Sequence, residues 1–225
     1  MALARNGVIH ETRLINTQDP AKFCAKSLTG NALISVYDKS RLEHLVGAFA
    51  RHKIKVISSG GTAQAIRKLR HEVVEVSAYT GFPEMPGGLV KTLHAKIHAG
   101  ILGDWNDPVQ LKYLQENGIE PVDFVVVNLY PFREVVKSDP VNLRRAIDNI
   151  DIGGVALIRA AAKGAFLNNR VVPLTRPAQY DVLIRELDKH EEIKDELRHK
   201  LAREAFAVTA EYDAAIKSYL GKVKG

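Results

Sequence analysis

Cysteine is almost missing from this chain of 225 residues, in which Cys24 is the only one. A single cysteine excludes a disulfide framework and a metal site built from several thiolates, and it is typical of proteins from a reducing cytosol. The sequence also lacks any run that approaches the roughly 20 apolar residues of a membrane-spanning helix. We therefore expect a cytoplasmic protein that does not bind a membrane.

Aromatic residues are scarce as well, at 7% of the chain. Lys and Arg number 32 against 26 Asp and Glu, so the formal net charge is +6 and favours anionic partners. Proteins that bind nucleic acids usually gather basic residues into patches with aromatic residues between them, whereas here the basic residues are scattered among acidic ones. We therefore expect a small phosphorylated metabolite or nucleotide as the ligand, and no nucleic acid.

The first 30 residues lack the regular patterning of the rest of the chain and carry a small basic excess. They contain no apolar core of a secretory signal. A targeting segment is the alternative, although Glu11 and Asp19 disfavour a transit peptide. The sequence predicts a poorly ordered or loosely packed extension over residues 1–30 and a single domain over residues 31–225.

Short apolar runs alternate with amphipathic segments from residue 32 onward. Strands are predicted at 32–36, 54–57 and 73–76, with helices at 40–52 and 63–69 between them. This alternation predicts an α/β protein of three layers, in which helices flank a mainly parallel sheet on both faces.

Later segments extend this pattern. The uninterrupted apolar run Phe124–Val127 predicts a strand at the centre of the sheet, buried on both faces. Pro173 lies in the predicted strand 171–174 and indicates a sheet edge or a strand end. Further helices are expected at 109–115, at 141–150, at 155–163 and, as a helical C-terminal extension, over most of 178–221.

Polar segments follow three of the predicted strands: Tyr37-Asp38-Lys39, Ser59-Gly60-Gly61-Thr62 and Asn128-Leu129-Tyr130. Ligands of open α/β sheets bind at the carboxyl ends of the strands. Glycines before a helix leave backbone N–H groups free to bind an anion, and the helix dipole favours negative charge there. Ser59–Thr62 is therefore a candidate phosphate site, and the alternative is a plain tight turn in which Thr62 caps the helix.

The segment Gly87–Leu102 opens as a loop and carries Lys91, His94, Lys96 and His98. It is either part of the ligand site or a solvated basic loop that runs into an ordinary helix. The two histidines have a spacing that allows metal binding, but no third ligand is evident. The sequence therefore predicts no metal site.

Asp151-Ile152-Gly153-Gly154 interrupts the helical pattern between residues 141 and 163. Asp151 either caps the following helix or directs its carboxylate into the ligand site. A Ser-His-Asp triad is not supported, because no nucleophile elbow is recognisable.

Together these segments resemble one protein family over roughly residues 31–220. The sequence is similar to the inosine monophosphate (IMP) cyclohydrolase domain of the bifunctional purine-biosynthesis protein, from the AICAR transformylase/IMP cyclohydrolase family. Six blocks in the family's order carry the resemblance: Leu33–Lys39, Ser59–Thr62, Gly81–Glu84, Val90–His94 with His98–Leu102, Asn128–Phe132, and Asp151–Gly154 through Arg159–Lys163.

The resemblance implies a methylglyoxal-synthase-like α/β fold. It also implies the conversion of 5-formamidoimidazole-4-carboxamide ribotide (FAICAR) to IMP with loss of water, the last step of de novo purine biosynthesis. The family's folate-dependent transformylase domain lies outside the matched stretch, so no cofactor is expected. The implied partners are a purine ribotide, a second copy in a homodimer, and a separate transformylase chain.

The resemblance places Lys91, Tyr130, Asp151 and Lys163 at the reacting end of the substrate. Lys163 paired with Asp151 is expected to transfer protons, and Lys91 and Tyr130 are expected to stabilise the formyl oxygen.

The remaining implied residues bind the substrate. Lys39 and Ser59–Thr62 are expected to hold the phosphate, and Asn128 the base or carboxamide. The implied binding residues are Tyr37, Asp38, Lys39, Ser59, Gly60, Gly61, Thr62, Val90, Thr92, Val127, Asn128, Ile152 and Gly153.

Two positions depart from the family pattern. Leu89 stands where the family usually has arginine, and Ala95 where it has proline. Loss of a cation beside an anionic ligand favours a second hypothesis, a non-catalytic nucleotide- or phosphate-sensing module of the same fold. A third, methylglyoxal-synthase-like lyase activity, requires paired aspartates, of which the sequence offers Asp38 alone.

Overall fold

The computed structural model describes residues 30–86, 88, 90–138, 142–190 and 193–223. The predicted N-terminal extension, residues 1–30, lies outside these ranges except for Gly30. Within the described ranges, no helix is long and apolar enough to cross a membrane.

One sheet forms the centre of the described part of the chain, with the strand order β3-β2-β1-β4-β5. Every pair of neighbouring strands is parallel, as predicted. The strands are β1 (Asn31–Val36), β2 (Lys55–Ser58), β3 (Val74–Glu75), β4 (Val122–Asn128) and β5 (Val172–Leu174).

The central strand is β1, so the prediction that Phe124–Val127 forms the centre is wrong by one position. These residues lie in β4, which is nevertheless buried on both faces because it pairs with β1 and β5. The prediction of an edge strand at Pro173 is confirmed, since β5 pairs only with β4. A proline has no N–H to donate and is tolerated at an edge.

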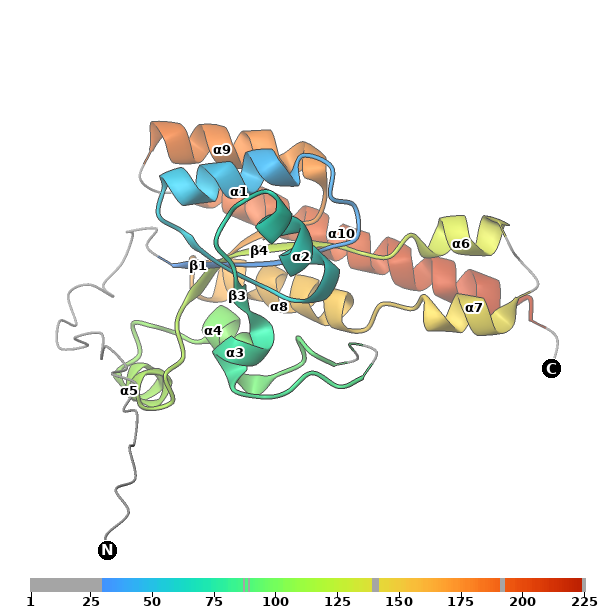
Figure 1. Cartoon of the computed structure of the whole chain (residues 1–225), viewed down its shortest axis with the longest axis horizontal. Helices are drawn as coiled ribbons and strands as arrows, with labels where there is room; N and C mark the ends of the chain where they lie inside the picture. The colour runs from blue at the N-terminus through green and yellow to red at the C-terminus, as the bar shows by residue number, and fades with distance from the viewer. Residues whose placement is uncertain (1–29, 87, 89, 139–141, 191–192, 224–225) are drawn as a thin grey trace, which may run out of the picture.

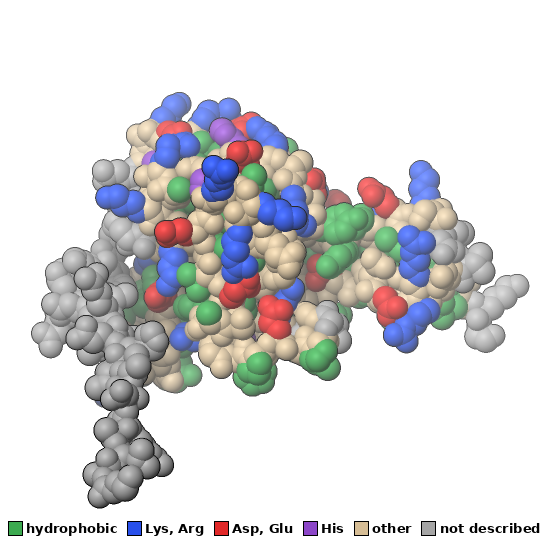
Figure 2. Space-filling view, in the orientation of Figure 1, with side chains coloured by type: hydrophobic (Ala, Val, Ile, Leu, Met, Phe, Trp, Pro, Cys, Tyr) green, Lys and Arg blue, Asp and Glu red, His purple; other side chains and the backbone are tan. Residues whose placement is uncertain are grey.

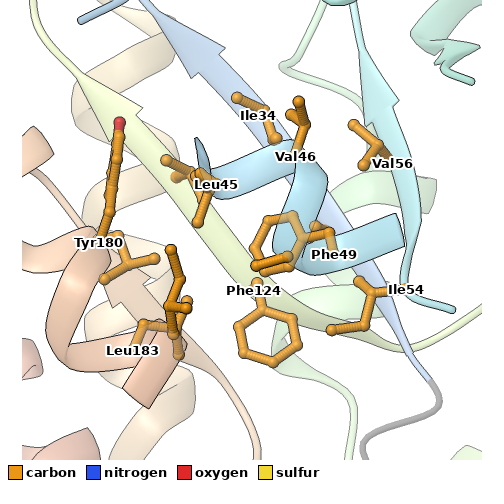
Figure 3. Packing of buried hydrophobic residues seen from close by; sticks show 14 of the residues in the cluster. Ile34, Leu45, Val46, Phe49, Ile54, Val56, Phe124, Tyr180 and Leu183 are labelled. Atoms are coloured by element: carbon orange, nitrogen blue, oxygen red, sulfur yellow. The ribbon is translucent and has the colours of Figure 1, made fainter. Parts of the chain in front are cut away.

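The first face of the sheet is covered by α1 (Leu42–Arg51), α2 (Gly60–Lys68) and α9 (Tyr180–Lys189) (Figure 1). Apolar residues recur along α1 at helical intervals and face the sheet, where Phe49 packs on Phe124 of β4 with ring centroids 5.2 Å apart (Figure 3). The buried ring of Tyr180, the first residue of α9, belongs to the same cluster.

The opposite face is covered by α3 (Val76–Thr80), α4 (Ala95–Leu102), α8 (Gly153–Leu167) and α10 (Asp195–Leu220). The inner side of α8 consists largely of alanine and glycine, so that the helix packs closely against the sheet and α10. Helices on both faces confirm the predicted three-layer α/β architecture, and α9 and α10 confirm the helical C-terminal part.

An arm projects from the body of the molecule beyond the carboxyl ends of the strands (Figure 1). It consists of α6 (Phe132–Ser138), α7 (Leu143–Asp148) and the last turns of α10, around the buried ring of Phe132. The remaining elements are α5 (Pro108–Glu116) and a short 3-10 helix, η2 (Pro177–Gln179). On the face in view, basic and acidic side chains are intermixed over body and arm (Figure 2), so the positive excess forms no single patch there.

Two helices begin earlier than the sequence predicts. α2 begins at Gly60 rather than residue 63, and α8 at Gly153 rather than residue 155. Glycine has a low helix propensity in a helix interior, but it is among the residues accepted at the start of a helix. Both early starts bring glycine backbone to the same edge of the sheet.

Candidate active site

Five segments meet at the carboxyl ends of the strands. Tyr37 and Asp38 follow β1, Ser59 follows β2, and Asn128 ends β4, where it pairs with Val36. The loop from Val90 to Thr92 and the start of α8 join them through the contacts described below. The structure therefore brings most of the predicted site residues to one edge of the sheet.

Asn128 joins the ends of two adjacent strands. Its Oδ1 accepts hydrogen bonds from the backbone N–H groups of Tyr37 at 2.7 Å and Asp38 at 2.8 Å. Its Nδ2 donates to the Asp38 carbonyl at 3.0 Å. The side chain expected to hold a ligand's base or carboxamide is thus engaged with the β1–α1 loop.

Thr62 makes a similar link between α2 and β1. Its hydroxyl donates to the Val36 carbonyl at 3.1 Å and accepts from the Val36 N–H at 3.2 Å. The side chain is buried. The hydroxyl therefore joins the start of α2 to the end of β1.

The N-terminus of α2 leaves backbone donors uncapped. Ser59 adopts the N-cap position but makes no side-chain capping bond, and the first N–H groups of a helix have no intrahelical acceptor. Gly60 begins the helix with a φ of 53°, a left-handed value that glycine adopts readily. These donors and the positive end of the helix dipole suit an anion.

Lys91 reaches this helix start from the neighbouring loop. A Cβ added at Gly60 would lie 2.5 Å from Lys91 Nζ, and one added at Gly88 would lie 3.4 Å from it. The ammonium therefore occupies space that any side chain at Gly60 would take. Val90, just before it, is exposed and has a φ of 54°, which is strained for a β-branched residue.

Asp151 lies half-buried just before α8. Its Oδ1 accepts a hydrogen bond from the Gly154 N–H at 2.7 Å. Its own N–H donates to the Tyr212 hydroxyl at 2.8 Å. Burial raises the pKa of Asp151, while the neighbouring backbone of Gly154 and Tyr130 opposes this rise. The prediction that Asp151 caps α8 is confirmed, whereas its role in a ligand site stays a prediction.

Two tyrosine rings lie side by side at this edge. Tyr37 and Tyr130 have ring centroids 5.3 Å apart and an interplanar angle of 55°. About half of each side chain is exposed, at 52% and 49%. Exposed aromatic faces of this kind can stack on a planar heterocycle.

The loop around Thr92 packs against the start of α8. Thr92 is buried, and its Oγ1 would lie 2.8 Å from a Cβ added at Gly153. Ile152, the N-cap of α8, is exposed and makes no side-chain capping bond. Val127 is buried inside β4, so its side chain does not line the edge.

Two predicted lysines lie differently from the others. Lys39 Nζ donates to the carbonyls of Val36 and Tyr37, both at 3.2 Å, so the ammonium stays at the end of β1. Lys163 is exposed on the body of α8. Because α8 is continuous from Gly153, the backbones of Lys163 and Asp151 lie about 18 Å apart, and the expected proton-transfer pair does not form within one chain.

The two histidines near Lys91 have structural contacts. His94 caps α4, with Nδ1 accepting from the Lys96 N–H at 3.1 Å, and burial lowers the pKa of His98. Among the described residues, no group of three or more potential metal ligands occurs. Leu89, where the family pattern has arginine, lies outside the described residues, and Ala95 is the first residue of α4.

Tyr180 and Tyr212 lie near this edge and were not predicted from the sequence. Burial raises the pKa of the Tyr180 hydroxyl to about 12. The Tyr212 hydroxyl accepts a hydrogen bond from the Asp151 N–H and donates one to the Asn149 carbonyl at 3.1 Å. Both tyrosines lie in a segment that the sequence predicts only as helical. The helical spacing of its apolar residues does not indicate which of them has a polar partner.

Comparison with known protein families gives two matches that divide the chain. Residues 41–156 match the MGS-like domain, and residues 161–225 match the AICARFT/IMPCHase bienzyme.

Similar sequences and structures agree with these matches. The bifunctional purine biosynthesis protein PurH of Bacillus cereus (strain AH187) is 44% identical over 195 residues, and PurH of Bacillus thuringiensis subsp. konkukian is 43% identical over 195 residues. Each alignment covers 86% of this chain and 37% of the relative, so the chain spans little more than a third of their length.

A solved structure described as the crystal structure of ForH has a TM-score of 0.74 and 31% sequence identity. That match covers 85% of this chain and 97% of ForH. The chain therefore belongs to the MGS-like domain family and is homologous to part of the bifunctional protein PurH.

Proposed function

We propose that this chain is an IMP cyclohydrolase of purine biosynthesis, which closes the ring of FAICAR to form IMP and water. The homology to part of PurH and the match of residues 161–225 to the AICARFT/IMPCHase bienzyme support this proposal. One observation carries it: an uncapped helix N-terminus with an adjacent ammonium, from Lys91, shares an edge of the sheet with the half-buried carboxylate of Asp151.

The ribotide phosphate binds at the start of α2. Backbone N–H groups of Gly60, Gly61 and Thr62 supply donors, and Lys91 supplies a full positive charge beside them. The location of Lys91 Nζ against Gly60 supports contact with the phosphate rather than with the reacting oxygen that the resemblance implies.

The base lies near Tyr37 and Tyr130. The Tyr130 backbone lies close enough to Asp151 to lower the pKa of its carboxyl group, so a base stacked on this pair has its carboxamide and formamido groups close to the carboxylate. Holding the carboxamide nitrogen against the formyl carbon supplies much of the rate enhancement, because it replaces a search through conformers by one reactive geometry.

Asp151 acts on the proton of the attacking amide. The carboxamide nitrogen forms a bond to the formyl carbon, the Asp151 carboxylate accepts a proton from this nitrogen, and the Tyr130 hydroxyl donates to the formyl oxygen. The formyl oxygen then leaves as water, with the proton held by Asp151 and the proton of the former formamido nitrogen. The bond from the carbon to this oxygen breaks, and a double bond forms between the carbon and the formamido nitrogen to give IMP. A carboxyl group with a raised pKa is suited to accept and return this proton.

Lys163 takes part only from a second copy of the chain. Within one chain α8 holds it about 18 Å from Asp151, whereas its exposed position leaves it accessible to the site of another copy. Its proton-transfer role therefore rests on the homodimer that the resemblance implies.

A direct assay tests the proposed function. The pure chain is incubated with FAICAR, and the formation of IMP is followed by ultraviolet absorbance. We expect turnover by the wild type and a loss of about 100-fold or more for Asp151→Asn. Asp148→Asn is the matched control, because this carboxylate pairs with Arg144 on the surface of α7. Binding of the nucleotide without turnover would contradict the proposal and select the sensing module.

A further inference from the structure

Val90 adopts a backbone conformation that its side chain disfavours. Its φ of 54° lies in the left-handed region, where a β-branched residue is an outlier. Among the described non-glycine residues with a positive φ, Val90 is the only one that is β-branched. Such a conformation costs free energy and persists where the surrounding structure enforces it, most often at ligand sites and switch regions. Val90 is therefore a candidate for a functional constraint on the backbone.

Contacts on both sides of Val90 hold this conformation. Before it, the Gly88 N–H donates to the Met85 carbonyl at 2.8 Å and closes a turn. After it, the Leu93 N–H donates to the Val90 carbonyl at 2.9 Å, and the Thr92 side chain is buried. The Val90 side chain itself is 58% exposed, so the backbone contacts, rather than packing of its isopropyl group, hold the left-handed φ.

The left-handed turn at Val90 determines where the next side chain points. Valine in its preferred β region has a φ of about −120°, roughly 170° away from the observed 54°. A rotation of this size at residue 90 would redirect the chain that follows it. With the observed turn, Lys91 Nζ lies 3.4 Å from the position of a Cβ at Gly88 and 2.5 Å from that of a Cβ at Gly60. The ammonium thus reaches the start of α2 because the chain folds back at Val90.

We propose that Val90 is a positioning residue, whose left-handed backbone directs the Lys91 ammonium to the start of α2. This inference rests on the proposed function in one respect, namely that the ribotide phosphate binds there. It assigns the role to the backbone of Val90, where the resemblance implies only that this residue binds the substrate. Substitutions at Val90 should then change affinity through Lys91, according to how well each new residue adopts a positive φ.

Two substitutions with opposite backbone preferences test the proposal. Proline fixes φ near −65°, so Val90→Pro should raise the Kd for IMP about tenfold, measured by titration calorimetry. Asparagine adopts the left-handed region more readily, so Val90→Asn should bind IMP at least about fivefold more tightly than Val90→Pro. Because the strain is relieved, Val90→Asn should also have a Tm about 2–4 °C above that of the wild type.

Lys53→Asn is the matched control for relief of strain. Lys53 has a φ of 57° in the turn that follows α1, where its N–H donates to the Ala50 carbonyl at 3.1 Å. The Tm of this variant should rise as well, whereas its Kd for IMP should equal that of the wild type, because this turn precedes β2 at the amino end of the strand.

A double-mutant cycle separates positioning from direct contact with the ligand. Lys91→Ala alone should weaken the binding of IMP, and adding Val90→Pro to this variant should change the Kd by less than about twofold. Independent losses that add up would overturn the proposal, because Val90 would then act without Lys91.

Val90→Asn decides the matter if proline prevents folding. The Leu93 amide hydrogen should exchange no faster in this variant than in the wild type, because the turn that it closes is retained. A lower Tm together with faster exchange at Leu93 would overturn the proposal. If the wild type binds IMP without turnover, the proposed function fails, and the cycle of Kd values still decides the positioning role.

Discussion

Lys91 Nζ occupies the space that a side chain at Gly60 would fill, since a Cβ there would lie 2.5 Å from the ammonium. The two residues are 31 positions apart in the chain, yet each depends on the other. The glycine leaves room for the cation at the start of α2, and the cation adds a full charge to the partial charge of the helix dipole.

Gly60→Ala should therefore weaken nucleotide binding more than it weakens the fold. The new methyl group displaces the flexible end of Lys91 and strains a residue with a φ of 53°. We expect the Kd for IMP to rise at least about tenfold, measured by titration calorimetry. Gly47→Ala in α1 is the control, because nothing lies within 4 Å of its added Cβ and alanine favours helix. Equal affinity for IMP in both variants would contradict a role of Lys91 in phosphate binding.

Thr62→Val should lower stability while leaving the anion site largely intact. The substitution removes the hydroxyl that bonds both polar groups of the Val36 backbone, and an unpaired buried group costs about 1–3 kcal/mol. Chemical denaturation measures the loss, and Thr62→Ser, which keeps the hydroxyl, should lose much less. Because the backbone of α2 supplies the donors, affinity for IMP should fall less than in Gly60→Ala. A larger fall would mean that the hydroxyl itself contacts the phosphate.

Asp151 should make stability depend on pH in a defined direction. Burial raises its pKa above the ordinary value of 3.8, so the folded state binds this proton more tightly than the unfolded state. The stabilising contribution is present below the unfolded pKa and is lost as the pH rises through the folded one. The free energy of unfolding of the wild type, relative to Asp151→Asn, should therefore decrease as the pH rises from about 3.8. A difference that is independent of pH, or that increases, would contradict the raised pKa.

Mixing two inactive variants tests whether Lys163 acts across a dimer. Asp151→Asn and Lys163→Ala should each be nearly inactive alone. In an equimolar mixture after subunit exchange, half of the dimers are mixed and each holds one intact site, so about a quarter of the wild-type activity should return. Size-exclusion chromatography with light scattering verifies the dimer. A Lys163→Ala variant with full activity, or a mixture that stays inactive, would refute the contribution from a second copy.

Local patterns in the sequence predict much of this fold. Alternating apolar and amphipathic segments predict the parallel sheet with helices on both faces, and Pro173 predicts the edge strand, because these features depend on the chemistry of neighbouring residues. The glycine and polar segments after the strands are predicted to meet at one edge, where the candidate site lies, since parallel strands end at the same side of a sheet.

Pairing between distant segments had to come from the tertiary structure. β1 rather than β4 is central because strand order depends on which strands meet, and an apolar strand buried on both faces has the same composition in either position. The separation of Lys163 from Asp151 follows from the length of α8, and this helix already begins at the two glycines Gly153 and Gly154.

Asn128 and Thr62 carry polar groups of the kind that commonly bind ligands, and the sequence alone predicts both residues as ligand contacts. In the structure their side chains are hydrogen-bonded to Tyr37 and Val36, which lie 91 and 26 positions away along the chain. A hydrogen bond of this kind depends on two backbones coming within about 3 Å, which no local pattern encodes. Residue types thus determine which groups can bind an anion or move a proton, and the packing of the sheet determines which of those groups are left free to do so.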